Sequence, residues 1–115
     1  MSRAFFRRRK DTNHTTIVAT FRALGCSVEN VEGRAGISDL VVGAMGRTHL
    51  VEVKPATNLA KHEANDAQQK FAREWRGSPV QLVRTMGDCA ELVRLWQNQA
   101  EVERRAAALL ARTEA

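Results

Sequence analysis

The sequence predicts an α/β fold in which a mixed β-sheet is flanked by helices, in the order α-β-β-β-α-β-α. Two runs rich in Val and Leu, at 36–43 and 49–54, are joined by a short glycine-containing turn, which predicts a β-hairpin. Apolar residues at helical spacing lie on both sides of this hairpin and predict flanking helices. The length of 115 residues leaves room for one domain with one modest core.

The segments before the hairpin predict one helix and one strand. Asp11 or Thr12 can cap the helix, and Gly25 closes it. We expect its buried stripe to consist of Ile17, Val18, Phe21 and Leu24. Residues 27–32 then alternate apolar and polar side chains, which is typical of a half-exposed strand. Glu29 on this strand either faces solvent or adds an acid near the hairpin.

The segments after the hairpin predict a loop, a helix, a strand and a final helix. Residues 55–65 are polar and form the loop, and Asp66 can cap the next helix. One face of that helix carries Gln68, Phe71 and Trp75. Residues 79–84 predict a strand with a proline at its start, and Gly87-Asp88 opens the last helix. The apolar stripe of the last helix comprises Leu92, Leu95, Trp96, Gln99, Val102, Ala106, Leu109 and Leu110.

Composition divides the chain into a basic N-terminal arm at 1–10, a folded domain at 11–97 and a helical extension at 98–115. The net charge is +5, and the five basic residues of the arm account for it, because the remainder has 18 − 5 = 13 basic and 13 acidic residues. The arm either adds salt-sensitive affinity for nucleic acid or is a solvated terminus. The extension keeps an apolar stripe, so we expect a homodimer or higher homo-oligomer, with a frayed terminal helix as the alternative.

Other sequence features argue against several classes of protein. No apolar run approaches the roughly 18 residues of a membrane span, and no apolar stretch follows the basic N-terminus as in a signal peptide. We therefore expect a soluble cytoplasmic protein without a membrane partner. Cys26 and Cys89 lack metal-binding spacing and are expected to be small buried hydrophobes. Trp75 and Trp96 are expected to lie in the core, and His49 to be structural or exposed.

Three charged residues interrupt the apolar hairpin. Asp39 heads its first strand, while Glu52 and Lys54 share one face near the end of the second. Unpaired charge on a buried strand is costly, and a divalent metal held by Asp39 and Glu52 would relieve that cost. Mg²⁺ typically takes one or two protein carboxylates, and the carbonyl of Val53 is well placed as a further ligand. A surface ion pair on an edge strand is the alternative interpretation.

These residues resemble a known family. Gly-x-Ser-Asp at 36–39, the hairpin, Leu-Val-Glu-Val-Lys at 50–54, and a helix with Gln before Phe and Trp-Arg-Gly resemble the PD-(D/E)XK nuclease superfamily. The chain is especially similar to small VRR-NUC and Holliday-junction-resolvase-like proteins of phages and mobile elements. The resemblance covers residues 11–96. It implies a restriction-endonuclease-like fold, dependence on Mg²⁺ or Mn²⁺, and cleavage of branched or structured DNA inside a bacterial cell.

The resemblance also implies roles for individual residues. Asp39 and Glu52 match the metal ligands, Lys54 matches the catalytic lysine, and Gln68 matches a glutamine that faces the site. There are two departures from the family pattern. Ser38 replaces the proline that names the superfamily, and the first helix has Asn or His where relatives often carry Glu, which favours one-metal chemistry. Residues expected to contact DNA are Arg7, Arg8, Arg9, Lys10, Asn13, His14 and Lys61.

Three functions are therefore compared. The first is a metal-dependent DNA endonuclease that hydrolyses phosphodiester bonds. The second is a protein with a nuclease fold that binds DNA or another protein without cutting it. The third is a small interaction module in which the charged strand residues form an ion pair. The presence of both carboxylates together with Lys54 favours the endonuclease.

Overall fold

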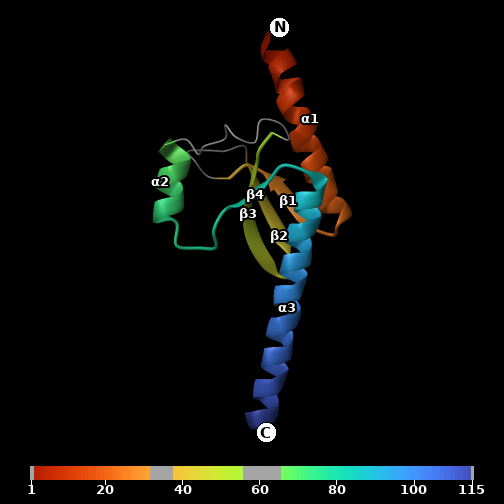
Figure 1. Cartoon of the computed structure of the whole chain (residues 1–115), viewed down its shortest axis with the longest axis vertical. Coiled ribbons are helices and arrows are strands. Elements are labelled where there is room, and N and C mark those ends of the chain that lie inside the picture. The colour runs from red at the N-terminus through yellow and green to blue at the C-terminus, as the bar shows by residue number, and fades with distance from the viewer. Residues whose placement is uncertain (1, 32–37, 56–65, 115) are drawn as a thin grey trace.

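The computed structural model of the chain describes residues 2–31, 38–55 and 66–114, with side chains from residue 13 onward except those of residues 67 and 114. It confirms the predicted α/β class and the predicted order of elements (Figure 1). These elements are α1 (Ser2–Ala23), β1 (Ser27–Asn30), β2 (Leu40–Ala44), β3 (Arg47–Val53), α2 (Asp66–Glu74), β4 (Gln81–Val83) and α3 (Met86–Glu114).

The four strands form one mixed sheet in the order β1-β2-β3-β4. The pairs β1–β2 and β2–β3 are antiparallel, and β3–β4 is parallel. The predicted hairpin turns at Met45 and Gly46, whose φ angles of 51° and 76° are both positive, as in the tight turns that suit the twist of a hairpin. A parallel pair requires a long crossover, and the segment that contains α2 provides it.

The core lies between one face of the sheet and the helices α1 and α3. Every second residue of a strand faces this core, and among these residues Val42 and Val51 pack in one cluster with Phe21 of α1 and Trp96 of α3. The rings of Phe21 and Trp96 stack at 6.0 Å, and Trp96 also stacks on His49 at 3.8 Å. These contacts confirm that Trp96 belongs to the core and that His49 has a structural position.

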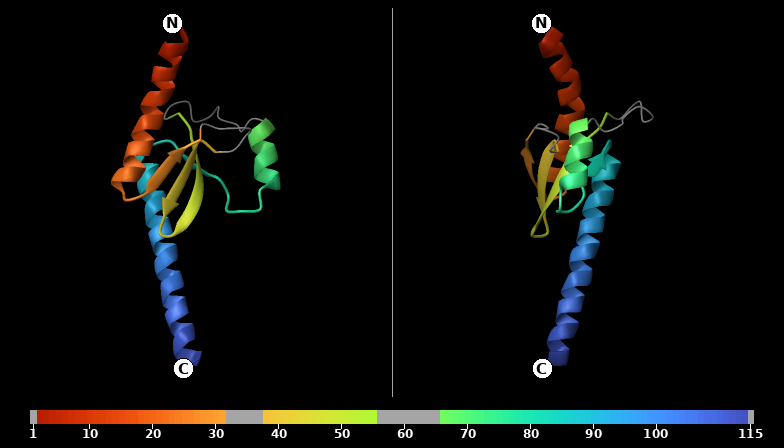
Figure 2. Two further views of the ribbon diagram at one scale, coloured as in Figure 1. Left: turned by 180° about the vertical axis from the view of Figure 1, so that it is seen from behind. Right: turned by 90° about the vertical axis from the view of Figure 1, so that its left-hand side faces the viewer.

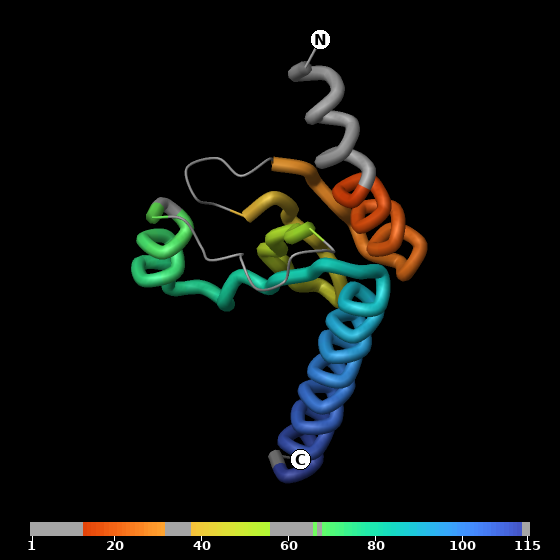
Figure 3. Tube along the Cα trace, turned by 45° about the horizontal axis from the view of Figure 1, so that its top comes forward, coloured from red at the N-terminus to blue at the C-terminus, as the bar shows by residue number. Residues whose placement is uncertain are grey.

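The helix α2 lies across the sheet from α1 and α3 (Figures 1 and 3). The helix α3 continues well beyond the sheet, and the molecule measures 67 × 32 × 25 Å (Figure 2). No helix of the described residues is long and apolar enough to cross a membrane. Cys26 and Cys89 are free and buried as expected, and burial raises the pKa of Cys89 to about 11.

Three predictions about the helices are wrong. The first helix begins at Ser2 and not at Asp11 or Thr12, because its first turns contain no proline or glycine and the Arg and Lys residues there favour helix. Trp75 is 45 % exposed and not part of the core, because it follows the last residue of α2, which stands apart from the other helices. Leu24 of the first predicted stripe is also exposed.

Candidate active site

Asp39 is held at the entrance of β2 by hydrogen bonds on both sides. Its carbonyl accepts a hydrogen bond of 2.9 Å from the backbone N–H of Val31, where the chain leaves β1. Its carboxylate oxygen Oδ2 accepts a second, also of 2.9 Å, from the backbone N–H of Val53 on β3. Ser38 is buried and donates its hydroxyl to the carbonyl of Leu40. The Asp39 carboxylate is therefore fixed beside the end of β3.

Glu52 lies within hydrogen-bonding reach of this carboxylate. Its side chain is only 5 % exposed and lies on the sheet face opposite Val51. The pKa of Glu52 is raised to about 8. Burial is the largest cause, the hydrogen bond and negative charge of Asp39 add to it, and the charge of Lys54 opposes it. At neutral pH the Glu52 carboxyl of the metal-free protein is therefore mostly protonated.

Gln68 reaches the same carboxylate from α2. Its amide Nε2 donates a hydrogen bond to Oε2 of Glu52. This contact joins α2 to the middle of the sheet, and it lies on the helix face that the sequence predicts. The structure therefore places the amide of Gln68 beside the Glu52 carboxylate, and its role in a catalytic site stays a prediction.

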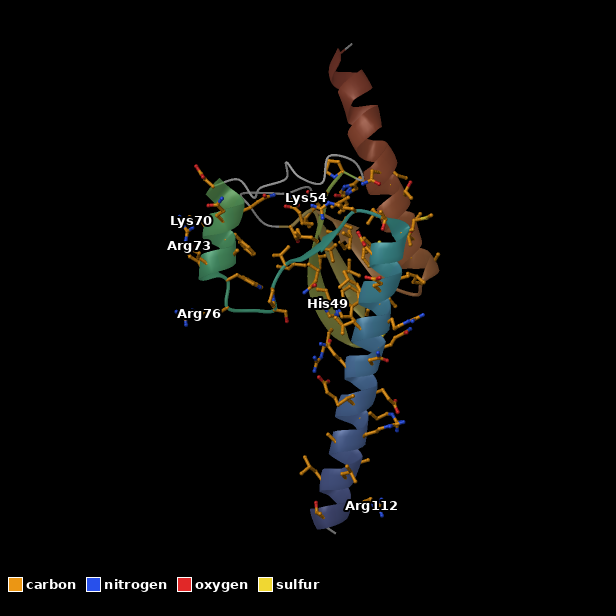
Figure 4. The ribbon with its side chains drawn as sticks, viewed as in Figure 1. His49, Lys54, Lys70, Arg73, Arg76 and Arg112 are labelled. Carbon is orange, nitrogen blue, oxygen red and sulfur yellow. The ribbon has the colours of Figure 1, made fainter. Side chains whose placement is uncertain are left out.

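Lys54 follows the last residue of β3, and its backbone is held by two different elements. Its N–H donates to the carbonyl of Val83 on β4 at 2.9 Å, and its carbonyl accepts from Nδ2 of Asn13 on α1 at 3.0 Å. Its half-buried side chain lies at the end of the sheet nearest the site (Figure 4). No ion pair within the described residues joins its ammonium to Asp39 or Glu52.

The structure thus brings together the four residues predicted to act in catalysis. Asp39 lies just before β2, Glu52 on β3, Lys54 just after β3 and Gln68 on α2. The contact of Asn13 with the Lys54 carbonyl is a feature that the sequence did not predict, because it joins residues 41 positions apart. His14 is half-buried, and its Nε2 atom has no hydrogen-bond partner among the described residues.

Several predicted contacts remain predictions. Lys61 and most of the predicted loop lie outside the described residues. Residues 7–10 belong to α1, and their side chains also lie outside the described part of the chain. The N–H of Val53 donates a hydrogen bond to Asp39. The role of the Val53 carbonyl as a metal ligand remains a prediction.

The donor set suits a small divalent cation. The described residues include no group of three or more His, Cys, Asp or Glu side chains that could hold a metal. Mg²⁺ does not need such a group, because it commonly binds through one or two carboxylates and keeps several waters. Asp39 and the buried Glu52, whose pKa is raised, are stabilised side by side when a cation replaces the proton of Glu52. The residues at the end of β3 therefore fit Mg²⁺ or Mn²⁺.

The chain was compared with protein families, with curated proteins and with solved structures. No family model, no curated protein and no solved structure matches this chain.

Proposed function

We propose that this protein is a metal-dependent DNA endonuclease that hydrolyses phosphodiester bonds in branched or otherwise structured DNA, inside a bacterial cell. The observation that carries the proposal is the convergence of Asp39 and Glu52 on one point, with Lys54 beside them. Two carboxylates and a lysine at the end of a strand are the groups that the resemblance to PD-(D/E)XK nucleases requires there. The order of strands and helices is the one expected from that resemblance.

Each residue of the site has a distinct task in this proposal. Asp39 and Glu52 would hold Mg²⁺, which when bound polarises a phosphate and lowers the pKa of a water. The N–H of Val53 and the amide of Gln68 orient the two carboxylates, so that little reorganisation is needed when the substrate arrives. The ammonium of Lys54 offsets the negative charge that develops on the phosphate, or orients the attacking water.

The charge of the chain supports DNA as the substrate. The excess of five positive charges is concentrated in the first turns of α1, at 3–10. The hydrogen bond between Asn13 and the Lys54 carbonyl joins this helix to the site. A basic helix end beside a phosphodiester-cleaving site would bind the substrate backbone without regard to sequence.

The proposed activity is tested by cleavage of a labelled DNA panel with Mg²⁺, Mn²⁺ or EDTA. The panel contains a single strand, a duplex, a flap and a four-way junction. We expect metal-dependent cutting, fastest on a branched substrate, and a loss of about 100- to 1000-fold in Lys54→Ala, because one charge-stabilising group is removed. Arg112→Ala serves as the control, since Arg112 lies in the last turn of α3, at the end of the helix far from the sheet (Figure 4).

Salt-sensitive DNA binding without cutting in any metal would contradict the endonuclease. It would favour the second function, a DNA-binding protein with a nuclease fold. Circular dichroism of each variant ensures that a loss of cutting is not a loss of folding.

We also propose that the protein forms a homodimer through the free part of α3. Leu95, Val102 and Leu109 are exposed and follow one another at intervals of seven residues, the spacing of a coiled-coil seam. Nearby charges on the helix are already paired within it, where Glu101 binds Arg104 and Arg105. The seam formed by these three apolar residues is therefore free of charge. The same seam on a second copy of the chain can pack against it.

Leu109→Lys should convert the dimer to a monomer, because a charge in the seam opposes burial of both helices. Sedimentation equilibrium at several protein concentrations measures the change. Arg104→Gln is the control on the opposite face of the helix and should leave the dimer intact. A wild-type protein that sediments as a monomer at all concentrations would contradict this assembly.

A further inference from the structure

Trp75 is an exposed aromatic side chain held in a defined position. Its indole Nε1 donates a hydrogen bond of 2.9 Å to the carbonyl of Ser78. Its ring stacks with that of Phe71 on α2, with 5.2 Å between centroids and 18° between planes. Gly77 lies so close to the ring that a Cβ there would come within 2.7 Å of it. The ring is therefore pre-organised, although 45 % of the residue is exposed.

Trp75 and Phe71, here called the aromatic platform, lie on the side of α2 that also carries Gln68. Gln68 contacts Glu52 of the candidate active site. Phe71 and Trp75 follow Gln68 by three and seven positions, which places them about 5 and about 10 Å farther along the helix direction. A ligand that reaches the site can therefore reach the platform as well.

The segment that carries the platform is also basic, on the outer side of α2, away from the Gln68 face. Lys70, Arg73 and Arg76 extend away from the sheet (Figure 4). None of them takes part in an ion pair within the part of the chain that the structure describes. Asp66 and Glu74 are the acidic residues of the segment 66–76, which therefore has three basic and two acidic residues and a net charge of +1. A polyanion that crosses this end of α2 meets net positive charge.

We propose that the aromatic platform stacks with an unpaired base of the DNA substrate, close to the bond that is cut. The proposal rests on the proposed function for the identity of the ligand as DNA. A base within a duplex is stacked on both faces, whereas an unpaired base offers a free face to an aromatic ring. The platform would therefore select DNA with single-stranded character, such as a flap or the arm of a branched molecule.

Binding in EDTA tests the platform without any requirement for catalysis. The full chain is titrated into a labelled oligothymidine and into a duplex, and anisotropy gives the two affinities. We expect Trp75→Ala to weaken binding of the oligothymidine by about tenfold, because one stacked base is lost, and to leave duplex binding nearly unchanged. Trp75→Phe should recover most of the loss, since a phenyl ring also stacks.

Gly77→Ala is a sharper variant because it leaves the indole in the chain. Its added Cβ would meet the ring at 2.7 Å, so the indole has to move out of the platform, and we expect weakened oligothymidine binding. Met86→Ala is the matched control, an exposed apolar residue at the start of α3. Intrinsic fluorescence is a second readout. The chain has two tryptophans and Trp96 is only 4 % exposed, so quenching by oligothymidine reports Trp75.

The outcomes separate this inference from the proposed function. Oligothymidine binding by Trp75→Ala that equals wild type would overturn the inference and leave the platform as a surface for a protein. Equal losses on oligothymidine and duplex would overturn it too, because stacking on an unpaired base predicts a difference. Quenching and selective binding in a wild-type protein that cuts nothing would support the platform while contradicting the nuclease.

Discussion

Glu52→Gln is expected to lower the rate of metal-dependent cleavage by about 1000-fold, because it removes a charge that fixes the cation on which the reaction depends. Glutamine keeps the shape of the side chain, and its oxygen can still accept the hydrogen bond from Gln68. The loss should therefore be chemical and not structural. Single-turnover cleavage at saturating Mg²⁺, with the substrate cut best by wild type, measures it.

Glu29→Gln is the matched control for this substitution. Glu29 is an exposed acid on β1, and the structure places it outside the cluster at the end of β3. Its replacement should leave the rate unchanged. A Glu52→Gln protein that cuts as fast as wild type would exclude Glu52 as a required metal ligand.

The same carboxylate predicts an unusual pH dependence of stability in the metal-free protein. Its pKa is about 8 in the folded chain against an ordinary value of 4.5, so between these limits the folded state keeps a proton that the unfolded state has released. The proton that Glu52 keeps stabilises the folded state relative to the unfolded state. This stabilisation is fully present below pH 4.5 and is lost as the pH rises through 8. Glu52 should therefore destabilise the metal-free protein at pH 8, on the order of 2–4 kcal/mol.

The difference in unfolding free energy between wild type and Glu52→Gln isolates this effect from all other titrating groups. Urea unfolding in EDTA should give similar stabilities at pH 5 and a more stable variant at pH 8. Addition of Mg²⁺ at pH 8 should stabilise wild type and not the variant, because only wild type has both carboxylates. A difference that does not change between pH 5 and 8 would mean that Glu52 is ionised in the fold at every pH tested.

The sequence predicts the sheet well because local patterns determine it. The hairpin follows from two β-branched runs and from a turn with Gly46, and alternation of side chains places Glu52 opposite Val51. Asp39 and Glu52 are 13 positions apart, and the register of one hairpin suffices to bring them together. Their proximity was therefore predictable from the residues themselves.

Other features depend on contacts that no local pattern records. The hydrogen bond from Asn13 to the Lys54 carbonyl depends on how α1 crosses the end of the sheet. The exposure of Trp75 was missed because helical spacing shows which side chains share a face but not whether another element covers that face. The start of α1 was missed because a good capping residue, Asp11, lies within a segment that is itself helical.

Metal binding tests most directly whether Asp39 and Glu52 form a metal centre. Calorimetric titration of the EDTA-free protein with Mn²⁺ at pH 7.5, repeated in buffers of different ionisation enthalpy, gives both the stoichiometry and the protons released. We predict about one ion per chain and release of about one proton, since the cation displaces the proton that Glu52 holds at this pH, and loss of both in Asp39→Asn. Absence of Mn²⁺ binding, or binding that is unchanged in Asp39→Asn, would contradict the metal centre and with it the proposed nuclease.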